Sequence, residues 1–325
     1  MLLKSFRTRR WQAAFHARYA FLEDAVPEPQ RLRVILGVGR SGTSWVSQVL
    51  FKTTLPGRCL SEPLFHMTPR LPFHRAGDHT AVPYEAMPPR HPLRRAYELL
   101  AHRQFDPVGL HGVARDEPGW EICLVKEVHA LLGAEGLLRA WGAPVVFILR
   151  DPVYVLDSLL AAQTLRTIYL DHEVEAVREP AFLRRFAPGR EEAVRRAFAR
   201  TARQESRPQI IQRKVLCVQL LQEMFAVLAG EFPSAKTWRY EQCCQTPEAS
   251  FRAIAAALAL PWDEALARGL AETTQADATS HQPYSVVRDT AQQTDRPLKF
   301  LTSAEAALCR AALAAIRSDS SDAPR

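Results

Sequence analysis

Lysine is scarce in this chain of 325 residues: only six of its 42 basic residues are lysine, and the others are arginine. Its six cysteines contain no C-x-x-C pair, which argues against a zinc site or a disulfide framework and favours reduced thiols. No run approaches the roughly 18 apolar residues of a membrane span, and the N-terminus lacks the sustained apolar stretch of an export signal. We therefore expect a cytoplasmic protein with no bound metal and no integral membrane association.

The net charge is +7, and the basic residues are spread along the chain without a long basic run. Nucleic-acid-binding proteins concentrate such residues on one face or stripe, so we do not expect nucleic acid as the main partner. Arginine grips phosphate and sulfate groups with two parallel hydrogen bonds, which favours a small anionic ligand. The alanine- and arginine-rich composition is typical of a bacterial protein.

A hydrophobic content of 47% is enough for the core of one large α/β domain or two modest ones. Near-continuous apolar segments, typical of buried parallel strands, alternate with segments of helical periodicity. The predicted strands are residues 33–38, 121–128, 144–152 and 234–240. This alternation predicts an α/β fold, a P-loop-like three-layer α/β/α sandwich with a mostly parallel central sheet.

Residues 31–316 are predicted to form a single domain, in which long amphipathic segments within about 165–232 predict a large helical insertion. Residues 1–30 have the pattern of a basic amphipathic helix. We expect it to pack on or flank the domain, and peripheral contact with a membrane surface is the alternative. Residues 317–325 form a polar tail, and the sequence does not predict an oligomeric state.

Residues 31–50 combine a predicted strand, a turn rich in glycine, serine and threonine, and a predicted helix. The turn, GVGRSGTS at 37–44, nearly matches the phosphate-binding pattern G-x-x-x-x-G-K-[ST], but Thr43 stands where that pattern has lysine. Backbone N–H groups and the helix dipole can bind an anion there without that lysine, and Arg40 supplies a cation. We expect a ligand with less charge than ATP that needs no metal. A turn that binds no ligand is the alternative.

A second motif, VVFILRDPVYVLDS, places Arg150 at the end of a predicted strand and Ser158 eight residues later on a predicted helix. Asp151 and Pro152 have the residue types that favour the cap and the first position of that helix. An arginine fork and a hydroxyl donor together suit a phosphate group. In the alternative interpretation, Arg150 pairs with a neighbouring carboxylate and Ser158 is a solvated helix residue.

The two motifs, in this order, resemble those of the sulfotransferases that use 3′-phosphoadenosine 5′-phosphosulfate (PAPS). GVGRSGTSW resembles the 5′-phosphosulfate loop of that family, and the Arg150 and Ser158 pair resembles its 3′-phosphate motif. The resemblance implies PAPS as the co-substrate, no metal requirement, and transfer of a sulfuryl group to a hydroxyl. The ligand contacts that it implies here are Arg40, Ser41, Gly42, Thr43, Ser44, Trp45, Arg150 and Ser158.

The segment CLSEPLFHM resembles the EP-x-[WF]-H segment of carbohydrate sulfotransferases. This resemblance makes Glu62 the leading general base, whereas His66 is expected to be structural. Lys126, at the end of a predicted strand, lies where related enzymes carry a lysine that can neutralise the bridging oxygen. Arg40, the cation of the phosphate loop, completes the catalytic candidates. His129 is the fallback base and is expected in the following helix.

Two C-terminal segments extend the resemblance. TWRYEQ resembles the family's [LV]RYED segment, and its residues Arg239, Tyr240 and Glu241 are expected to brace the sheet near the nucleotide. Residues 281–305 resemble the loop that closes over the nucleotide, which implies Ser285 and Arg288 as contacts. This loop lacks the tryptophan that the family usually has there, so its alignment stays open.

The EPLFH segment favours a carbohydrate or a glycosylated metabolite as the small-molecule or glycan acceptor. Two other functions stay open from the sequence. One is a P-loop small-molecule kinase with a degenerate lysine, and the other is a non-catalytic nucleotide-binding protein that keeps the motifs.

Overall fold

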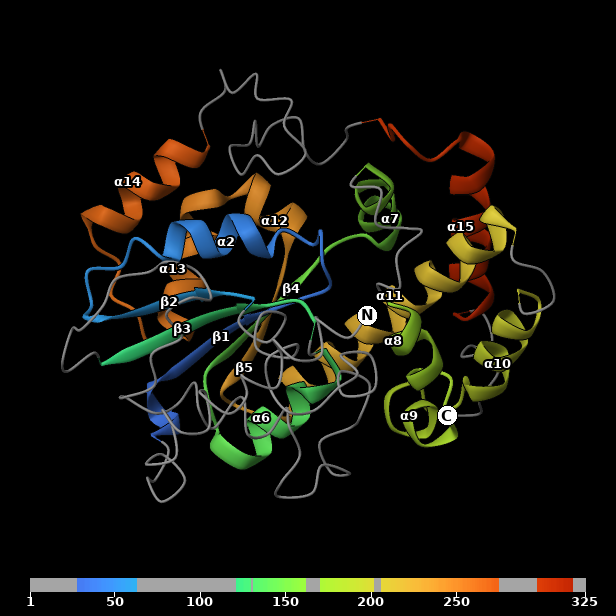
Figure 1. Ribbon diagram of the computed structural model, residues 1–325, viewed down its shortest axis with the longest axis horizontal. Coiled ribbons are helices and arrows are strands. Elements are labelled where there is room, and N and C mark those ends of the chain that lie inside the picture. Colours follow the sequence, from blue (N-terminus) through green and yellow to red (C-terminus); the bar gives the residue numbers. More distant parts are fainter. Residues whose placement is uncertain are drawn as a thin grey trace, which may run out of the picture.

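The computed structural model describes residues 28–62, 121–129, 131–161, 170–201, 206–274 and 297–317. Five strands and the helices around them make up this part of the chain (Figure 1). The strands are β1 Leu32–Leu36, β2 Gly57–Ser61, β3 Ile122–Glu127, β4 Val145–Leu149 and β5 Ala235–Arg239. The α-helices are α2 Thr43–Leu50, α6 Ala134–Trp141, α7 Pro152–Ala161, α8 Asp171–Ala176, α9 Pro180–Phe186, α10 Glu191–Ala199, α11 Arg207–Glu231, α12 Tyr240–Gln245, α13 Pro247–Ala257, α14 Glu264–Thr273 and α15 Ser303–Ala315, and short 3₁₀ turns lie at Pro29–Arg31 and Leu131–Gly133.

The strands form one parallel sheet in the order β2-β3-β1-β4-β5. Leu36 at the end of β1 is in register with Glu127 of β3 and Phe147 of β4. The predicted α/β fold with a parallel central sheet is therefore confirmed. The sequence pattern left β2 without an assignment, because its five residues, GRCLS, are too polar to stand out from a loop.

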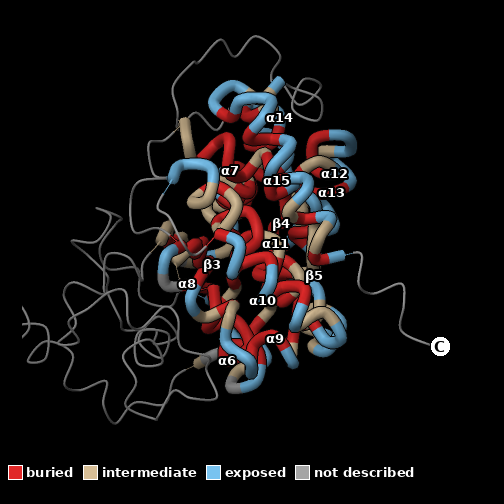
Figure 2. Tube along the Cα trace, turned by 90° about the vertical axis from the view of Figure 1, so that its right-hand side faces the viewer, coloured by how far each residue is buried: buried red, intermediate tan, exposed pale blue. Residues whose placement is uncertain are grey.

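Helices cover both faces of the sheet, which gives the three layers of an α/β/α sandwich (Figure 1). On one face, α2, α12, α13 and α14 pack around Ile35, Val146 and Ile148. On the other face, α6, α7, α11 and α15 pack around Val34 and Leu36. Residues that alternate along β1 thus belong to two different cores, as the period of a strand requires. The buried residues follow the sheet and its adjoining helix faces (Figure 2).

Local signals in the sequence explain where several helices begin. The Asp151 carboxylate accepts a hydrogen bond of 2.7 Å from the Val153 N–H, and Pro152 is the first residue of α7. Thr302 and Glu305 form the capping box of α15. Both arrangements satisfy N–H groups that the first helical turn leaves without an intrahelical acceptor.

The predicted helical block is confirmed over its described residues, which form α8, α9, α10 and α11. The 25-residue helix α11 packs against α7, β5 and α15, so it ties this block to the rest of the fold. The predicted N-terminal helix lies almost wholly outside the described residues, and so do all of residues 63–120 and most of the tail. No described helix is both long and apolar enough to cross a membrane.

The connections after β1 and β4 leave the sheet in opposite directions. Helix α2, which follows β1, lies on one face, whereas α7, which follows β4, lies on the other. Neighbouring parallel strands with this arrangement open a crevice beyond their carboxyl ends, where ligands of open α/β sheets bind. The loop after β1 and Arg150 after β4 therefore lie where the fold favours ligand binding.

Candidate functional site

The loop between β1 and α2 has the geometry of an anion-binding turn. Arg40 and Gly42 both have left-handed backbone conformations, with φ of 73° and 104°. The backbone N–H groups of Gly42, Thr43 and Ser44 donate to no acceptor among the described residues. Three successive N–H groups at the start of a helix form a positively polarised concavity that favours negative charge.

Only glycine fits at position 42. A Cβ atom there would lie 2.3 Å from the ring of Tyr240, far inside van der Waals contact. Its φ of 104° is also costly for any residue with a side chain. The ring of Tyr240, a residue that is 2% exposed, thus packs directly against the backbone of the loop.

Two side chains of this loop that were expected to contact the ligand, Ser41 and Thr43, are buried. Ser41 is fully buried, its hydroxyl faces Gly37, and its N–H donates to the Val38 carbonyl at 3.0 Å. The Thr43 methyl group also lies against Gly37. The Ser41 and Thr43 side chains thus pack against Gly37 inside the loop. Of the three residues of the loop that carry a hydroxyl, Ser41, Thr43 and Ser44, only Ser44 is exposed.

Trp45 is likewise a core residue. Its indole N–H donates to the Thr273 hydroxyl at 3.0 Å, and its ring packs edge-on against Tyr240 and Phe251. Its backbone N–H donates a hydrogen bond of 3.0 Å to the Gly42 carbonyl. These contacts place Trp45 in the core, and its expected contact with a ligand stays a prediction.

The two sequence motifs contact each other beyond the carboxyl ends of β1 and β4. The Arg40 Nε donates to the Ser158 hydroxyl at 2.9 Å, and the Arg150 Nη1 donates to the Arg40 carbonyl at 3.0 Å. Ser158 is 7% exposed, so the alternative of a solvated helix residue does not hold. Arg40 thus contacts both members of the second motif, across more than a hundred residues of sequence.

Arg150 is held from several sides and is only 6% exposed. Its guanidinium lies 4.4 Å from the centre of the Tyr240 ring, which is a favourable cation–π distance. Its carbonyl accepts a hydrogen bond of 2.6 Å from the Gln222 side chain on α11, and the next backbone N–H, that of Asp151, donates to Glu241 at 3.0 Å. The expected bracing by Tyr240 and Glu241 thus takes the form of direct contacts with Arg150 and the residue after it.

Glu62, Lys126 and His129 form a charged cluster at the ends of β2 and β3. The Lys126 ammonium, 3% exposed, donates to one carboxylate oxygen of Glu62, and the His129 Nε2 lies 3.4 Å from the other. The Glu62 backbone is fixed by a hydrogen bond of 2.7 Å from its N–H to the Lys126 carbonyl. Its φ of 52° is left-handed, as is that of Arg40. Such strained residues tend to gather at functional sites.

These contacts control the acidity of Glu62. The hydrogen bond from His129, and then the charge and hydrogen bond of Lys126, outweigh desolvation and lower the pKa of Glu62 from 4.5 to about 2. The carboxylate is therefore ionised at neutral pH and is a weak base while both contacts persist.

His129 lies in the turn after β3 and not in a helix, which corrects the expectation from the sequence. Its backbone N–H and that of Val128 donate to the carboxylate of Glu127, at 2.9 and 2.8 Å. Glu127 is fully buried. Sequence reasoning missed this residue, although a carboxylate at the end of an apolar strand is an unusual signal.

The candidate residues follow the order of the strands along one edge of the sheet. Glu62 follows β2, Lys126 is near the end of β3, Arg40 lies in the loop after β1, and Arg150 follows β4. Three strand spacings separate β2 from β4, or about 14 Å. The Glu62 carboxylate, the loop after β1 and Arg150 therefore lie within the length of one extended ligand.

Three predicted residues, His66, Ser285 and Arg288, lie outside the described residues. Within the described ranges, no group of three or more His, Cys, Asp or Glu side chains is arranged to hold a metal ion.

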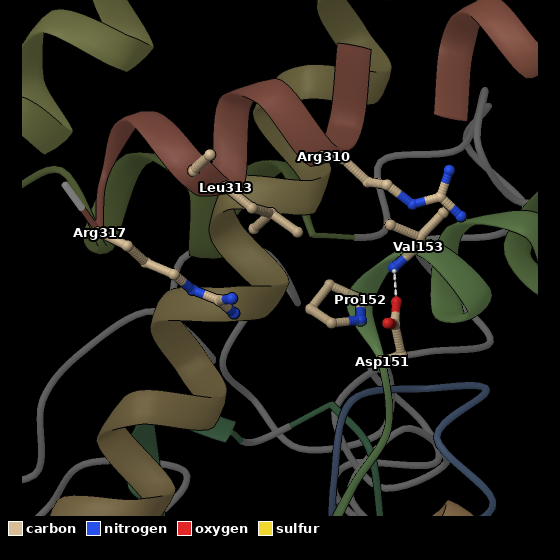
Figure 3. A pocket seen from close by; sticks show the side chains of 7 residues that line it. Asp151, Pro152, Val153, Arg310, Leu313 and Arg317 are labelled. Atoms are coloured by element: carbon tan, nitrogen blue, oxygen red, sulfur yellow. Dashed lines mark hydrogen bonds between the residues drawn. The ribbon is translucent and has the colours of Figure 1, made fainter. Parts of the chain in front are cut away.

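A pocket of about 510 Å³ lies between the start of α7 and the face of α15 (Figure 3). Asp151, Pro152 and Val153 line it on one side, and Arg310 and Arg317 line it on the other. The pocket shares the turn after Arg150 with the crevice, but none of the candidate site residues is among its described lining.

No protein-family model matches the chain, and no curated protein matches it.

Proposed function

We propose that the protein transfers a sulfuryl group from PAPS to a hydroxyl acceptor. The observation that carries this proposal is the meeting of two anion-binding motifs in one crevice, through the contacts of Arg40 with Ser158 and Arg150. A ligand with anionic groups at two separated positions matches this arrangement better than a ligand with a single anionic end.

In this proposal, the N–H groups of Gly42, Thr43 and Ser44 bind the 5′-phosphosulfate, together with the Arg40 guanidinium. Arg150 and Ser158 bind the 3′-phosphate. The site supplies hydrogen-bond donors and two guanidinium groups, so the ligand would need no metal to neutralise its charge. The buried Thr43, which stands where a lysine reaches the phosphates of nucleotide triphosphates, fits a 5′-phosphosulfate, because that group carries less charge than the triphosphate of ATP.

The transfer would proceed by in-line attack of the acceptor oxygen on sulfur, with cleavage of the bond between sulfur and the bridging 5′-phosphate oxygen. The acceptor proton passes to Glu62, and the leaving nucleotide is 3′-phosphoadenosine 5′-phosphate. Lys126 would leave Glu62 to neutralise the bridging oxygen as negative charge develops there. Loss of that partner raises the proton affinity of Glu62 at the step in which it must accept a proton. Arg40 would stabilise the charge on the transferred group.

The decisive experiment is a titration with 3′-phosphoadenosine 5′-phosphate in the absence of magnesium. We expect a micromolar dissociation constant, which corresponds to about −8 kcal/mol. No detectable binding would overturn the proposal, and ATP binding that requires magnesium would indicate a kinase instead.

We propose a carbohydrate or glycosylated metabolite as the acceptor, because the EPLFH segment resembles carbohydrate sulfotransferases. A panel of sugar, glycoside and phenol acceptors with radiolabelled sulfuryl donor tests this assignment. Label found only on phenols would contradict the carbohydrate class and leave the transfer chemistry in place.

A further inference from the structure

Arg40 has a backbone conformation that its residue type disfavours. Its φ of 73° lies in the left-handed region, which side chains with a Cβ atom avoid and glycine adopts easily. The three N–H groups of residues 42–44, which donate to no acceptor among the described residues, follow directly. The direction of these donors therefore depends on whatever keeps Arg40 in this conformation.

One hydrogen bond has the right position to do so. The Arg150 Nη1 donates to the carbonyl oxygen of Arg40, at 3.0 Å. The orientation of that carbonyl is set by the backbone torsions on either side of it. We propose that Arg150 is a positioning residue for the phosphate loop, and that its bond to the Arg40 carbonyl keeps the loop in its anion-binding conformation.

Arg150 is rigid enough for this task. The ring of Tyr240 lies against its guanidinium, and Gln222 and Glu241 bind the carbonyl and the N–H of the peptide group that joins Arg150 to Asp151. The same Tyr240 ring lies close to Gly42 and so limits movement of the loop toward β5. The Arg150 side chain thus connects a fixed strand end to a strained loop.

This inference extends the proposed function, and its consequence for nucleotide binding rests on that function. If Arg150 both binds the 3′-phosphate and positions the loop, the two ends of the ligand are energetically coupled. Loss of Arg150 then weakens even a ligand that has no 3′-phosphate. If Arg150 is only a 3′-phosphate contact, such a ligand is unaffected.

The first test uses urea unfolding of the full chain without ligand. Arg40→Gly and Arg40→Ala remove the same side chain but differ in their tolerance of a φ near 73°. With Arg150 present, we expect the Arg40→Gly variant to have an unfolding equilibrium constant about fivefold smaller than that of Arg40→Ala. The Arg150→Met substitution removes the hydrogen-bond donor and keeps an apolar side chain against Tyr240. In that background, the unfolding equilibrium constants of Arg40→Gly and Arg40→Ala should differ by less than twofold. The same ratio in both backgrounds would overturn the inference.

The second test measures binding of adenosine 5′-phosphosulfate, which lacks the 3′-phosphate. We expect Arg150→Met to weaken this binding about tenfold, the size of one lost charge-assisted hydrogen bond. In the Arg150→Met background, Arg40→Gly should bind several-fold tighter than Arg40→Ala. Unchanged affinity of Arg150→Met would overturn the inference.

The two tests separate this inference from the proposed function. If the wild-type chain binds no adenosine nucleotide while the unfolding ratio depends on Arg150, the proposed function fails and the positioning role stands. If the nucleotide binds and the ratio is independent of Arg150, the positioning role fails and the proposed function stands.

Discussion

The side chain of Arg40 donates a hydrogen bond of 2.9 Å to the hydroxyl of Ser158, a residue 118 positions later in the chain. This hydrogen bond joins the loop after β1 to α7, the helix after β4. In the proposed complex, the Ser158 hydroxyl would accept the hydrogen bond from Arg40 and donate one to the 3′-phosphate.

Replacing Ser158 with alanine should weaken binding of 3′-phosphoadenosine 5′-phosphate by about tenfold, because it removes one donor to a charged group and frees the Arg40 side chain. Binding of adenosine 5′-phosphosulfate should weaken less. Ser44→Ala is the matched control, since it removes an exposed hydroxyl at the other end of the ligand. Isothermal titration with both nucleotides checks the contrast, and equal losses in the two variants would contradict it.

Replacing Glu62 with glutamine should abolish sulfuryl transfer and retain binding of 3′-phosphoadenosine 5′-phosphate. It should also lower the free energy of unfolding by about 2 kcal/mol, because the nearly buried Lys126 ammonium loses its carboxylate. Glu248→Gln, at a side chain that is 68% exposed and paired with Arg252, is the control and should change stability little. Retained turnover in Glu62→Gln would assign the proton transfer to another group, with His129 the nearest candidate.

The stabilising effect of Glu62 should depend on pH in a defined direction. Its pKa is lowered from 4.5 to about 2 in the folded protein, so its contribution is present above the ordinary value and is lost as pH falls toward the lower one. The stability difference between wild type and Glu62→Gln should therefore be constant at neutral pH and shrink between pH 4.5 and about 2. Urea unfolding at several pH values measures it, and a difference that grows with acid would show that the pKa is not lowered.

Replacing Gly42 with alanine should disrupt the loop. The new Cβ would lie 2.3 Å from the Tyr240 ring, at a φ of 104°. We expect a loss of about 3 kcal/mol in the free energy of unfolding and no measurable nucleotide binding. Gly142→Ala is the control, because Gly142 also has a positive φ but has nothing within 4 Å of its added Cβ. The Gly142→Ala control should lose only about 1 kcal/mol in the free energy of unfolding and bind nucleotide normally. Equal losses in the two variants would contradict the role of Tyr240.

Replacing Asp157 with alanine should loosen the segment before α15. One oxygen of this fully buried carboxylate accepts hydrogen bonds of 2.7 to 3.0 Å from the N–H groups of three successive residues, 299–301. We expect a loss of about 3 kcal/mol in stability and faster hydrogen exchange at these three amides. Asp263→Ala, which removes a more exposed carboxylate cap from α14, should lose about 1 kcal/mol. Unchanged exchange at 299–301 would contradict this role.

The sequence predicted four of the five strands and the two motifs because each depends on a local pattern. β1 and β3 are near-continuous apolar runs and β4 is a continuous one, and Arg150 follows directly from β4. The direction of the loop side chains was not predictable, because Ser41 and Thr43 turn under the loop only as a result of the left-handed backbone at Arg40 and Gly42.

Contacts between distant segments were also beyond the sequence pattern. β2 becomes a strand only through its pairing with β3, and its own residues carry little strand preference. Gln222 is one polar residue on a long helix, and nothing in its neighbourhood of the sequence connects it to Arg150, 72 residues earlier. Such contacts are set by packing of the whole fold, which no local pattern contains.

The bond between Gln222 and the Arg150 carbonyl has an implication for how this protein could diversify. In the proposed function, the acceptor would be bound by parts of the chain without a family motif, such as the helical block that includes α11. One polar side chain nevertheless joins it to the strand end that would grip the nucleotide. Mutations that tilt or shift α11 to admit a different acceptor should therefore carry a penalty in donor affinity, unless position 222 and its register along the helix are preserved.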